Sequence, residues 1–531
     1  MYRWKKHRKR SGGKTAFLTL VIFAAALFIS PALAGSEEGS QGVESGRSAL
    51  ISRKALYDYD EKTYQTYGQG ELQGVILSRE DAQQHPALAA SLKAYSDHMF
   101  SELSERFKEY CEWSRTDHQE YQKDYEAYVR TDVIMRRYDG EVFSFVQKYE
   151  DYSGGAHGYY SFTGHSFDVS TGEEIPLSAV ITDEEAFRNV VREKLEDQYQ
   201  NYLEPDLSDL LCSYAISGGE YDYNWVMEHD GISVMFNPYA IAPYAAGAQH
   251  IHIGFSEYPD LFTDAYHARQ GAFCYRMDQW LDDRVDLDGD GQFEDFSITW
   301  EYDNYDGAME NGGRVSIGVN CGNNSCTRSD LYYFNMKGLM MHTADGRNYL
   351  YLDLTSENDY HSIHVFDLSH EAPFWAGSMD AGLAWQWDEA SDLVSTVMPM
   401  DPESFLLETR MQMLSTYGGY RTYHLDENGM ACTEDPYYIA SGSGMKLKTV
   451  RDLPVTLIEA DGPEDVGTET GGGTVGAGEE LTIWRTDGKE VVDLKKADGS
   501  IVRVRITGSG WPRKIEGEDE ESYFERLYYA G

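Results

Sequence analysis

The chain has 531 residues and a formal net charge of −45, with 90 acidic against 45 basic side chains. This excess of negative charge argues against nucleic acid and anionic lipid headgroups as partners, because their phosphates would be repelled. The length predicts roughly two to four domains, and the forty tyrosines offer enough core material to exclude global disorder.

Residues 1–34 have the pattern of an export signal. Seven basic residues precede an apolar run over residues 16–29. A pattern of small residues that ends at Ala34 predicts cleavage by signal peptidase there. The apolar run is shorter than the roughly 20 residues that span a bilayer, and Pro31 lies two positions beyond its end. The protein is therefore predicted to be secreted or on the cell surface. If the leader is retained, it becomes a membrane anchor.

The next part of the chain predicts an α+β module. Residues 35–51 are rich in Ser, Gly and Glu, which is typical of a flexible stalk. Helical apolar spacing follows over 86–128 and again over 183–203. Strands are expected over 130–138 and 141–149, joined by the hairpin signal Asp139-Gly140, and over 231–236 and 250–255. Residues 52–258 are thus predicted to form an antiparallel sheet with two helices.

Two phrases in this module carry a family resemblance. Residues 154–160 read Gly-Gly-Ala-His-Gly-Tyr-Tyr, and residues 236–247 read Phe-Asn-Pro-Tyr-Ala-Ile-Ala-Pro-Tyr-Ala-Ala-Gly. Together they resemble the extracellular module shared by RsiV-type anti-sigma factors and PdaC-type peptidoglycan deacetylases. The resemblance covers residues 52–258 and implies a surface module of a Gram-positive bacterium. Such a module would meet cell-wall glycan or host lysozyme.

Neither family activity is carried over. The cationic stretch before the apolar run is too short for the sigma-binding segment of those anti-sigma factors. The deacetylase phrases Thr-Phe-Asp-Asp-Gly and His-x-x-x-His do not occur in the chain. The chain is therefore expected to be a non-catalytic binding or sensing protein of the envelope. A cell-wall hydrolase or deacetylase with unidentified catalytic residues and a structural envelope component are the alternatives.

The two phrases supply the candidate binding residues. Glycines let a ligand approach the backbone closely, and exposed tyrosines suit carbohydrate or protein contacts. The alternative is that the glycines only shape turns and the tyrosines are buried. A cationic partner such as lysozyme also suits the negative charge of the chain, although an acidic surface can serve solubility alone. The candidate residues are Gly154, Gly155, His157, Asn237, Tyr239 and Tyr244.

A calcium-type loop is expected over residues 286–295. Carboxylates at alternate positions converge on a cation when the backbone coils, and dense hard oxygen ligands favour Ca²⁺. Ser297 occupies the position where an EF-hand has its closing glutamate, so the loop resembles dockerin-like and integrin-like loops instead. An acidic turn without metal is the alternative, and a bound ion would be structural. The predicted ligands are Asp286, Asp288, Asp290, Gln292, Glu294 and Asp295.

The rest of the chain predicts β structure. Short strands with Gly, Asp and Asn turns fill residues 271–440, a linker is expected over 461–480, and residues 481–531 suit a small barrel, SH3-like in its spacing. A Gly-Asn turn between Cys321 and Cys326 favours a disulfide, with a metal site as the alternative. His250 and His252 lie two apart on a strand, and are expected at the surface rather than on a metal.

Overall fold

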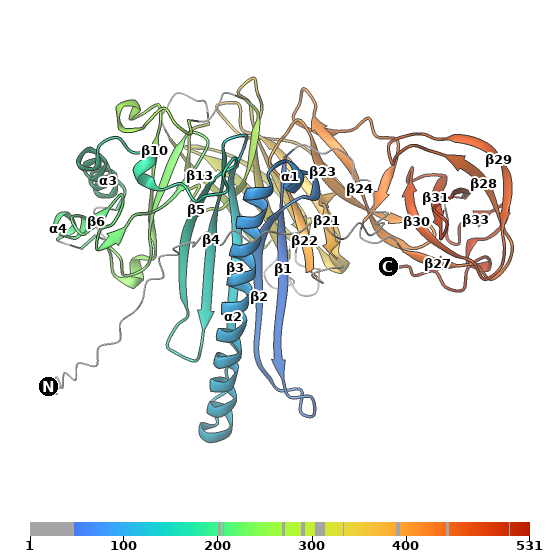
Figure 1. The fold of residues 1–531 in the computed structure, drawn as a ribbon, viewed down its shortest axis with the longest axis horizontal. Helices are drawn as coiled ribbons and strands as arrows, with labels where there is room; N and C mark the ends of the chain where they lie inside the picture. The colour runs from blue at the N-terminus through green and yellow to red at the C-terminus, as the bar shows by residue number, and fades with distance from the viewer. Residues whose placement is uncertain are drawn as a thin grey trace, which may run out of the picture. The chain divides into compact units, whose positions relative to one another are not determined.

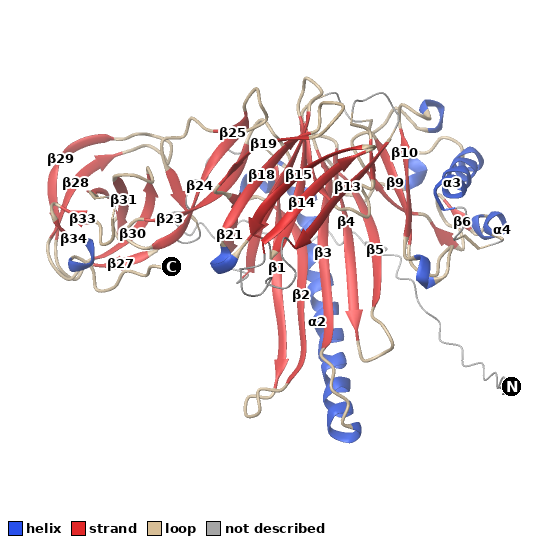
Figure 2. Cartoon of the chain, turned by 180° about the vertical axis from the view of Figure 1, so that it is seen from behind, coloured by secondary structure: helices blue, strands red, loops and turns tan. Residues whose placement is uncertain are grey.

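The computed structural model describes residues 47–199, 203–204, 206–267, 271–287, 293–302, 314–332, 334–388, 393–441, 445–508 and 510–530. The leader, its predicted cleavage at Ala34 and most of the predicted stalk lie outside these residues. Strands dominate the described part of the chain, as Figures 1 and 2 show. No helix within the described ranges is long and apolar enough to cross a membrane.

A seven-stranded sheet organises the N-terminal part of the chain. Its order is β21-β22-β1-β2-β3-β4-β5, and its pairs are antiparallel except β2 and β3. The strands are β1 Ser48–Tyr59, β2 Thr66–Leu77, β3 Ala127–Tyr138, β4 Val142–Tyr152, β5 Tyr159–Asp168, β21 Trp385–Asp388 and β22 Leu393–Pro399. The hairpin predicted at Asp139-Gly140 is confirmed between β3 and β4. The predicted stalk extends too far, because residues 48–51 belong to β1.

Helix α2 (Pro86–Tyr121) makes the long crossover that the parallel pair β2–β3 requires, and it follows the short helix α1 (Arg79–Gln84). Pro86 suits the first helical turn, and Leu88, Leu92 and Phe107 lie on the buried face. The helix ends earlier than residue 128 because Gln122 takes the left-handed conformation, with φ 53°.

A smaller α+β part follows β5. A three-stranded antiparallel sheet packs around the buried side chains Phe187, Val191 and Leu195 of α3. Its strands β9 and β10 confirm the two strands predicted from the sequence, and α3 confirms the second helix, although it ends before residue 203. The elements are α3 Glu184–Tyr199, α4 Leu207–Leu211, β6 Tyr214–Ala215, β7 Tyr221–Asp222, β8 Asn224–Met227, β9 Gly231–Phe236 and β10 Gln249–Gly254.

The middle of the chain forms two further antiparallel sheets, of order β11-β16-β17-β18-β19 and β12-β13-β14-β15. The strands are β11 Phe273–Met277, β12 Arg284–Val285, β13 Glu294–Tyr302, β14 Arg314–Cys321, β15 Asn324–Tyr332, β16 Asn335–His342, β17 Asn348–Thr355, β18 His361–Asp367 and β19 Phe374–Met379. The prediction that residues 52–258 and 271–440 form separate domains is wrong. Strand β22 belongs to the large N-terminal sheet, where it pairs with β1 from Ser48↔Pro399 to Arg53↔Val394.

The C-terminal strands share one large sheet with strands from the middle of the chain. Residues 461–480 are not a linker, because β29 lies within them and pairs with β28. The predicted turns at 486–489 and 496–500 do join β30, β31 and β32. The strands are β20 Gly382–Leu383, β23 Phe405–Gln412, β24 Thr416–Leu425, β25 Ala431–Cys432, β26 Tyr438–Ala440, β27 Lys446–Lys448, β28 Leu453–Glu459, β29 Thr468–Val475, β30 Glu480–Thr486, β31 Val491–Lys496, β32 Ile501–Arg505, β33 Lys514–Ile515 and β34 Glu518–Asp519.

The architecture is therefore an α+β N-terminal part followed by mostly β structure, as expected from the sequence. Short 3₁₀ turns complete the described elements: η1 Leu177–Ala179, η2 Tyr244–Ala246, η3 Pro259–Leu261, η5 Glu357–Asp359 and η6 Glu520–Ser522. The SH3-like character of the C-terminal strands stays a prediction.

Candidate functional site

The two phrases of the sequence lie against each other. The glycine-rich loop connects β4 to β5, and the second phrase runs from the end of β9 to η2, just before β10. The Tyr244 hydroxyl donates a hydrogen bond to the Gly158 carbonyl over 2.7 Å. The His157 ring stacks on the Tyr244 ring, with centroids 4.1 Å apart and planes 22° apart. Residues about eighty positions apart thus form one surface.

Gly154 gives the first loop its shape. Its φ of +94° is unfavourable for other residues, and a Cβ there would lie 2.4 Å from the Tyr125 ring. The Gly155 carbonyl accepts a hydrogen bond of 3.1 Å from the Tyr152 hydroxyl. Gly154 therefore fits the turn-shaping alternative, while Gly155 and His157 are exposed at the end of the loop.

Asn237 holds the second loop to the edge of the large sheet. Its side-chain oxygen accepts a hydrogen bond from the Phe162 N–H (2.7 Å), and its amide donates to the Phe162 carbonyl (3.0 Å). Edge strands leave such backbone groups without a partner, and a side-chain amide can satisfy both. Asn237 therefore positions the second loop against β5, and its binding role stays a prediction.

Several aromatic side chains gather around these two loops. Tyr239 is 65% exposed, and its ring lies 5.2 Å from that of Tyr244. Tyr160 contacts Tyr244 edge-on at 6.3 Å, and its hydroxyl accepts a hydrogen bond from the Ala248 N–H. Tyr128 stacks on Tyr152 at 5.9 Å. We call this group the aromatic cluster; it consists of Tyr128, Tyr152, His157, Tyr160, Tyr239 and Tyr244.

A second group of charged side chains is buried where β3, β8 and the residues after β11 meet. The Arg136 guanidinium donates two hydrogen bonds to the Asp282 carboxylate (2.7 and 2.9 Å) and one to Glu228 (3.0 Å). The Ser233 hydroxyl donates to the other Glu228 oxygen over 2.7 Å. Arg136 is only 3% exposed, so these bonds compensate the cost of burying its charge.

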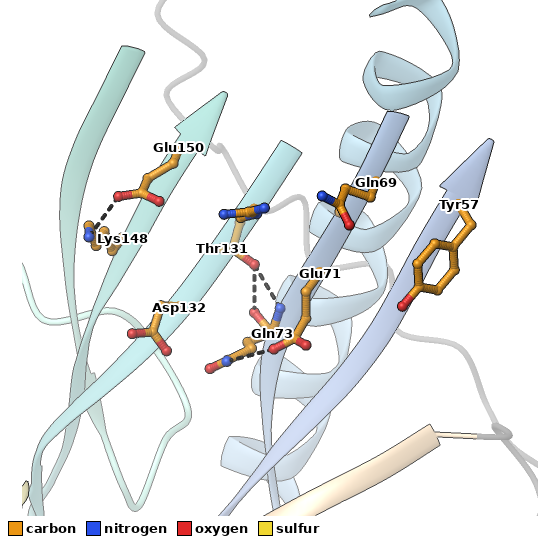
Figure 3. A pocket seen from close by; sticks show the side chains of 10 residues that line it. Tyr57, Gln69, Glu71, Gln73, Thr131, Asp132, Lys148 and Glu150 are labelled. Carbon is orange, nitrogen blue, oxygen red and sulfur yellow. Dashed lines mark hydrogen bonds and ion pairs between the residues drawn. The ribbon is translucent and has the colours of Figure 1, made fainter. Parts of the chain in front are cut away.

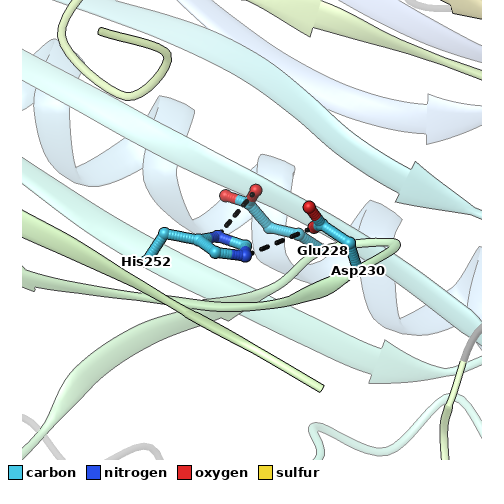
Figure 4. A group of neighbouring side chains, drawn as sticks. All are labelled: Glu228, Asp230 and His252. Atoms are coloured by element: carbon cyan, nitrogen blue, oxygen red, sulfur yellow. Dashed lines mark ion pairs between the residues drawn. The ribbon is translucent and has the colours of Figure 1, made fainter. Parts of the chain in front are cut away.

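His252 extends this network. Its Nδ1 lies 3.6 Å from a Glu228 oxygen, and its Nε2 lies 3.5 Å from an Asp230 oxygen, as Figure 4 shows. These three residues are close enough to hold a metal ion. However, the two ring nitrogens face different carboxylates, and Glu228 is already bonded to Arg136. The arrangement therefore fits an imidazolium that bridges two carboxylates better than it fits a metal ligand.

The surface placement predicted for the two histidines is wrong. His250 is 4% exposed, stands 3.3 Å from an Asp283 oxygen, and packs beside the Trp280 ring at 4.8 Å. Both histidines sit on β10, whose partner β9 carries Ser233 opposite His252. Alternation on a strand correctly places the two on one face, but the sequence contained no signal that this face would be covered.

The network makes stability depend on pH. Burial opposes protonation of His252, but Asp230 and Glu228 outweigh it and raise the pKa of the imidazole above 6.5. A pKa raised by folding contributes stability that is full below the unfolded value and lost as pH rises through the folded value. We expect the loss of stability caused by His252→Gln to be largest below about pH 6 and to shrink at higher pH. Chemical denaturation across this range measures it, and a pH-independent loss would contradict the account.

Only the ends of the calcium-type loop can be located. Asp288, Asp290 and Gln292 lie outside the described residues. Asp286 follows β12, while Glu294 and Asp295 begin β13, which pairs with β12. A Glu294 oxygen accepts a hydrogen bond from the Leu287 N–H over 3.0 Å, so this carboxylate turns toward the loop. Calcium stays a prediction.

Calcium removal tests this prediction. We expect millimolar Ca²⁺ to raise the melting temperature relative to EDTA, because an ion that binds only the folded chain stabilises it by mass action. The double variant Asp288→Asn/Asp290→Asn should lose that rise. Mg²⁺ at the same concentration is the control, and an equal rise with both ions would contradict a calcium site.

The disulfide predicted between Cys321 and Cys326 is not formed, and both residues are free thiols. The hairpin pairs Cys321 with Asn324 across the turn. Cys326 therefore pairs with Val319, two residues along the strand from Cys321. Two residues offset in this way lie farther apart than a disulfide allows.

Comparison with known proteins identifies one region. Residues 178–256 match the family described as "Protein of unknown function (DUF3298)". A DUF3298 family structure from Bacteroides fragilis shares 18% identity and a TM-score of 0.31, covering 41% of this chain and 96% of that chain. A DUF3298 family structure from Pseudomonas aeruginosa has 12% sequence identity to this chain and a TM-score of 0.29, and the match covers 43% of this chain and 100% of that chain. No curated protein matches. The part of the chain that is similar to the DUF3298 family, residues 178–256, contains α3, α4 and the β8–β10 sheet.

Proposed function

We propose that this chain is a non-catalytic binding protein of a Gram-positive cell envelope, and that its aromatic cluster recognises cell-wall glycan. The observation that carries the proposal is the arrangement of the exposed His157 and Tyr239 on either side of the half-buried Tyr244, with successive rings 4.1 and 5.2 Å apart. Rigid aromatic faces provide a large contact area for the apolar face of a sugar.

The export signal predicted in residues 1–34 and the resemblance to RsiV-type and PdaC-type modules support the location of this function. A protein carried outside the cell, or held there by its leader, meets the cell wall directly. Four residues of the aromatic cluster, His157, Tyr160, Tyr239 and Tyr244, lie in the two phrases that carry the resemblance. This overlap is the reason for placing the binding function there.

A cationic protein such as lysozyme is the second candidate ligand. The observation in its favour is the net charge of −45, which would accelerate encounter with a cationic partner. The two candidates differ in their salt dependence, because stacking on sugars is insensitive to ionic strength while long-range attraction between proteins is screened.

Co-sedimentation with insoluble peptidoglycan tests the proposal, and calorimetry with hen lysozyme tests the second candidate. We expect the protein to sediment with peptidoglycan at both about 50 mM and about 500 mM salt. Binding to lysozyme alone, lost at the higher salt, would replace the glycan proposal by the second candidate. Absence of both would overturn the binding function.

A further inference from the structure

The face of the large sheet opposite α2 carries an open groove of about 390 Å³ across strands β1 to β4. Figure 3 shows the side chains of the groove in front of the sheet, with α2 behind. Alternation along β4 explains this placement, since Gln147 and Tyr149 contact α2 while Lys148 and Glu150 point to the other face. The groove therefore lies on a part of the sheet that the helix leaves open.

The register of the strands aligns aromatic rings with this groove. Four residues form one row across β1, β2, β3 and β4, through the pairs Tyr57↔Gln69, Gln69↔Tyr128 and Tyr128↔Tyr152. Residues that pair in this way share a face of the sheet. In the next row, β5 contributes Tyr160 to the same face. Three members of the aromatic cluster thus share the face of the groove, and the Arg130 guanidinium on its wall lies over the Tyr128 ring at 4.9 Å.

Tyr57 stands at the side of the groove that is far from the aromatic cluster. Its side chain is 71% exposed, and it forms no hydrogen bond or ring contact with another described residue. Neighbouring strands lie about 4.8 Å apart, so β1 and β5, four intervals apart in the sheet, are separated by about 19 Å. This distance exceeds the length of a disaccharide and matches that of a tetrasaccharide.

The charged side chains of the groove largely compensate one another. The lining carboxylates form the ion pairs Glu71–Arg53, Asp132–Arg276 and Glu150–Lys148. A carboxylate has about four lone-pair sites, so each of them can also accept a hydrogen bond from a hydroxyl group. Tyr57 is the single large aromatic or apolar side chain of the described lining. Such a lining suits a neutral ligand with many hydroxyl groups better than an apolar peptide or a phosphate.

We propose that the glycan held by the aromatic cluster continues across this groove, so that the protein binds a linear stretch of about four sugars rather than a single sugar or a chain end. The Tyr57 ring stacks on the far sugar, and the polar side chains of the groove bind the hydroxyl groups between Tyr57 and the cluster. This inference rests on the proposed function, because the aromatic cluster supplies the other half of the site.

Titration with peptidoglycan strands of increasing length tests the inference. The ligands are a disaccharide, a tetrasaccharide and a hexasaccharide without peptides, and calorimetry of the full chain measures their affinities. We expect the tetrasaccharide to bind about tenfold tighter than the disaccharide or more, because contacts added to a bound ligand do not repeat the entropic cost of association. The hexasaccharide should gain no more than about twofold over the tetrasaccharide.

The outcomes separate this inference from the proposed function. Equal affinity of the disaccharide and the tetrasaccharide would overturn the groove as a subsite and leave binding by the aromatic cluster intact. A gain from tetrasaccharide to hexasaccharide as large as the first gain would contradict the span from Tyr57 to the cluster. Absence of binding by all three strands would overturn the inference together with the proposed function.

Substitutions of Tyr57 assign the length dependence to the groove. Tyr57→Ala should weaken tetrasaccharide binding about tenfold and leave disaccharide binding unchanged, whereas Tyr57→Phe keeps the ring and should bind like wild type. Tyr121→Ala is the matched control, because it removes a ring that is 62% exposed on α2. Tyr239→Ala should weaken the binding of both ligands, since it alters the cluster. Wild-type affinity of Tyr57→Ala for the tetrasaccharide would overturn the proposed subsite.

Discussion

Replacing Arg136 by methionine is expected to lower the free energy of unfolding by about 3–5 kcal/mol. The substitution removes the guanidinium that bonds Asp282 and Glu228, and leaves two buried carboxylates without their main counter-charge. It also removes the side-chain bond from β3 of the large sheet to Glu228, which lies in the region that matches the DUF3298 family. Urea denaturation of the purified variant measures the loss.

Arg53→Gln is the matched control. Arg53 also forms a two-bond pair with a carboxylate, that of Glu71, but its side chain is 46% exposed. An exposed pair contributes only about 0–1 kcal/mol, so the two variants separate burial from the mere loss of a charge. A similar small loss in both variants would show that the Arg136 network does not hold these parts together.

The second large effect concerns binding. Tyr239→Ala should weaken binding to soluble peptidoglycan glycan strands at least tenfold, because a highly exposed aromatic ring that stacks on a sugar contributes on the order of 1–3 kcal/mol. Tyr239 forms no described side-chain hydrogen bond, and its removal should leave the melting temperature within about 2 °C of wild type. Fluorescence-detected titration and a thermal melt measure the two quantities.

Tyr244 provides the internal comparison. Tyr244→Phe removes the hydroxyl that donates to Gly158 but keeps the ring that stacks on His157. If stacking is the source of affinity, this variant should bind better than Tyr244→Ala. Equal loss in the two variants would instead assign the effect to the shape of the glycine-rich loop.

Local patterns predicted the elements of the fold but not their association. The apolar spacing of α2 and the Asp139-Gly140 turn depend on neighbours in sequence, so the helix and the hairpin could be located. The pairing of β1 with β22 joins residues more than three hundred positions apart. No sequence periodicity reports such a contact, which is why the predicted domain boundaries were wrong.

For the candidate site as well, the sequence predicted the local features but not the long-range contacts. The two phrases contain four of the six residues of the aromatic cluster, and in the structure the Gly154 turn and the Asn237 amide hold the two loops that carry them. The Arg136 network could not be found in the sequence. Arg136, Glu228 and Asp282 come from separate parts of the fold, and in a chain with 90 carboxylates no such partners can be selected from the sequence alone.

The central claim is tested most directly by calorimetric titration of the wild-type chain with soluble glycan strands of peptidoglycan, followed by analysis of the recovered strands. The account predicts saturable binding and strands that keep their length and their acetyl groups. No heat of binding from folded protein would contradict the glycan-binding function. Shortened or deacetylated strands would contradict the claim that the protein is not an enzyme.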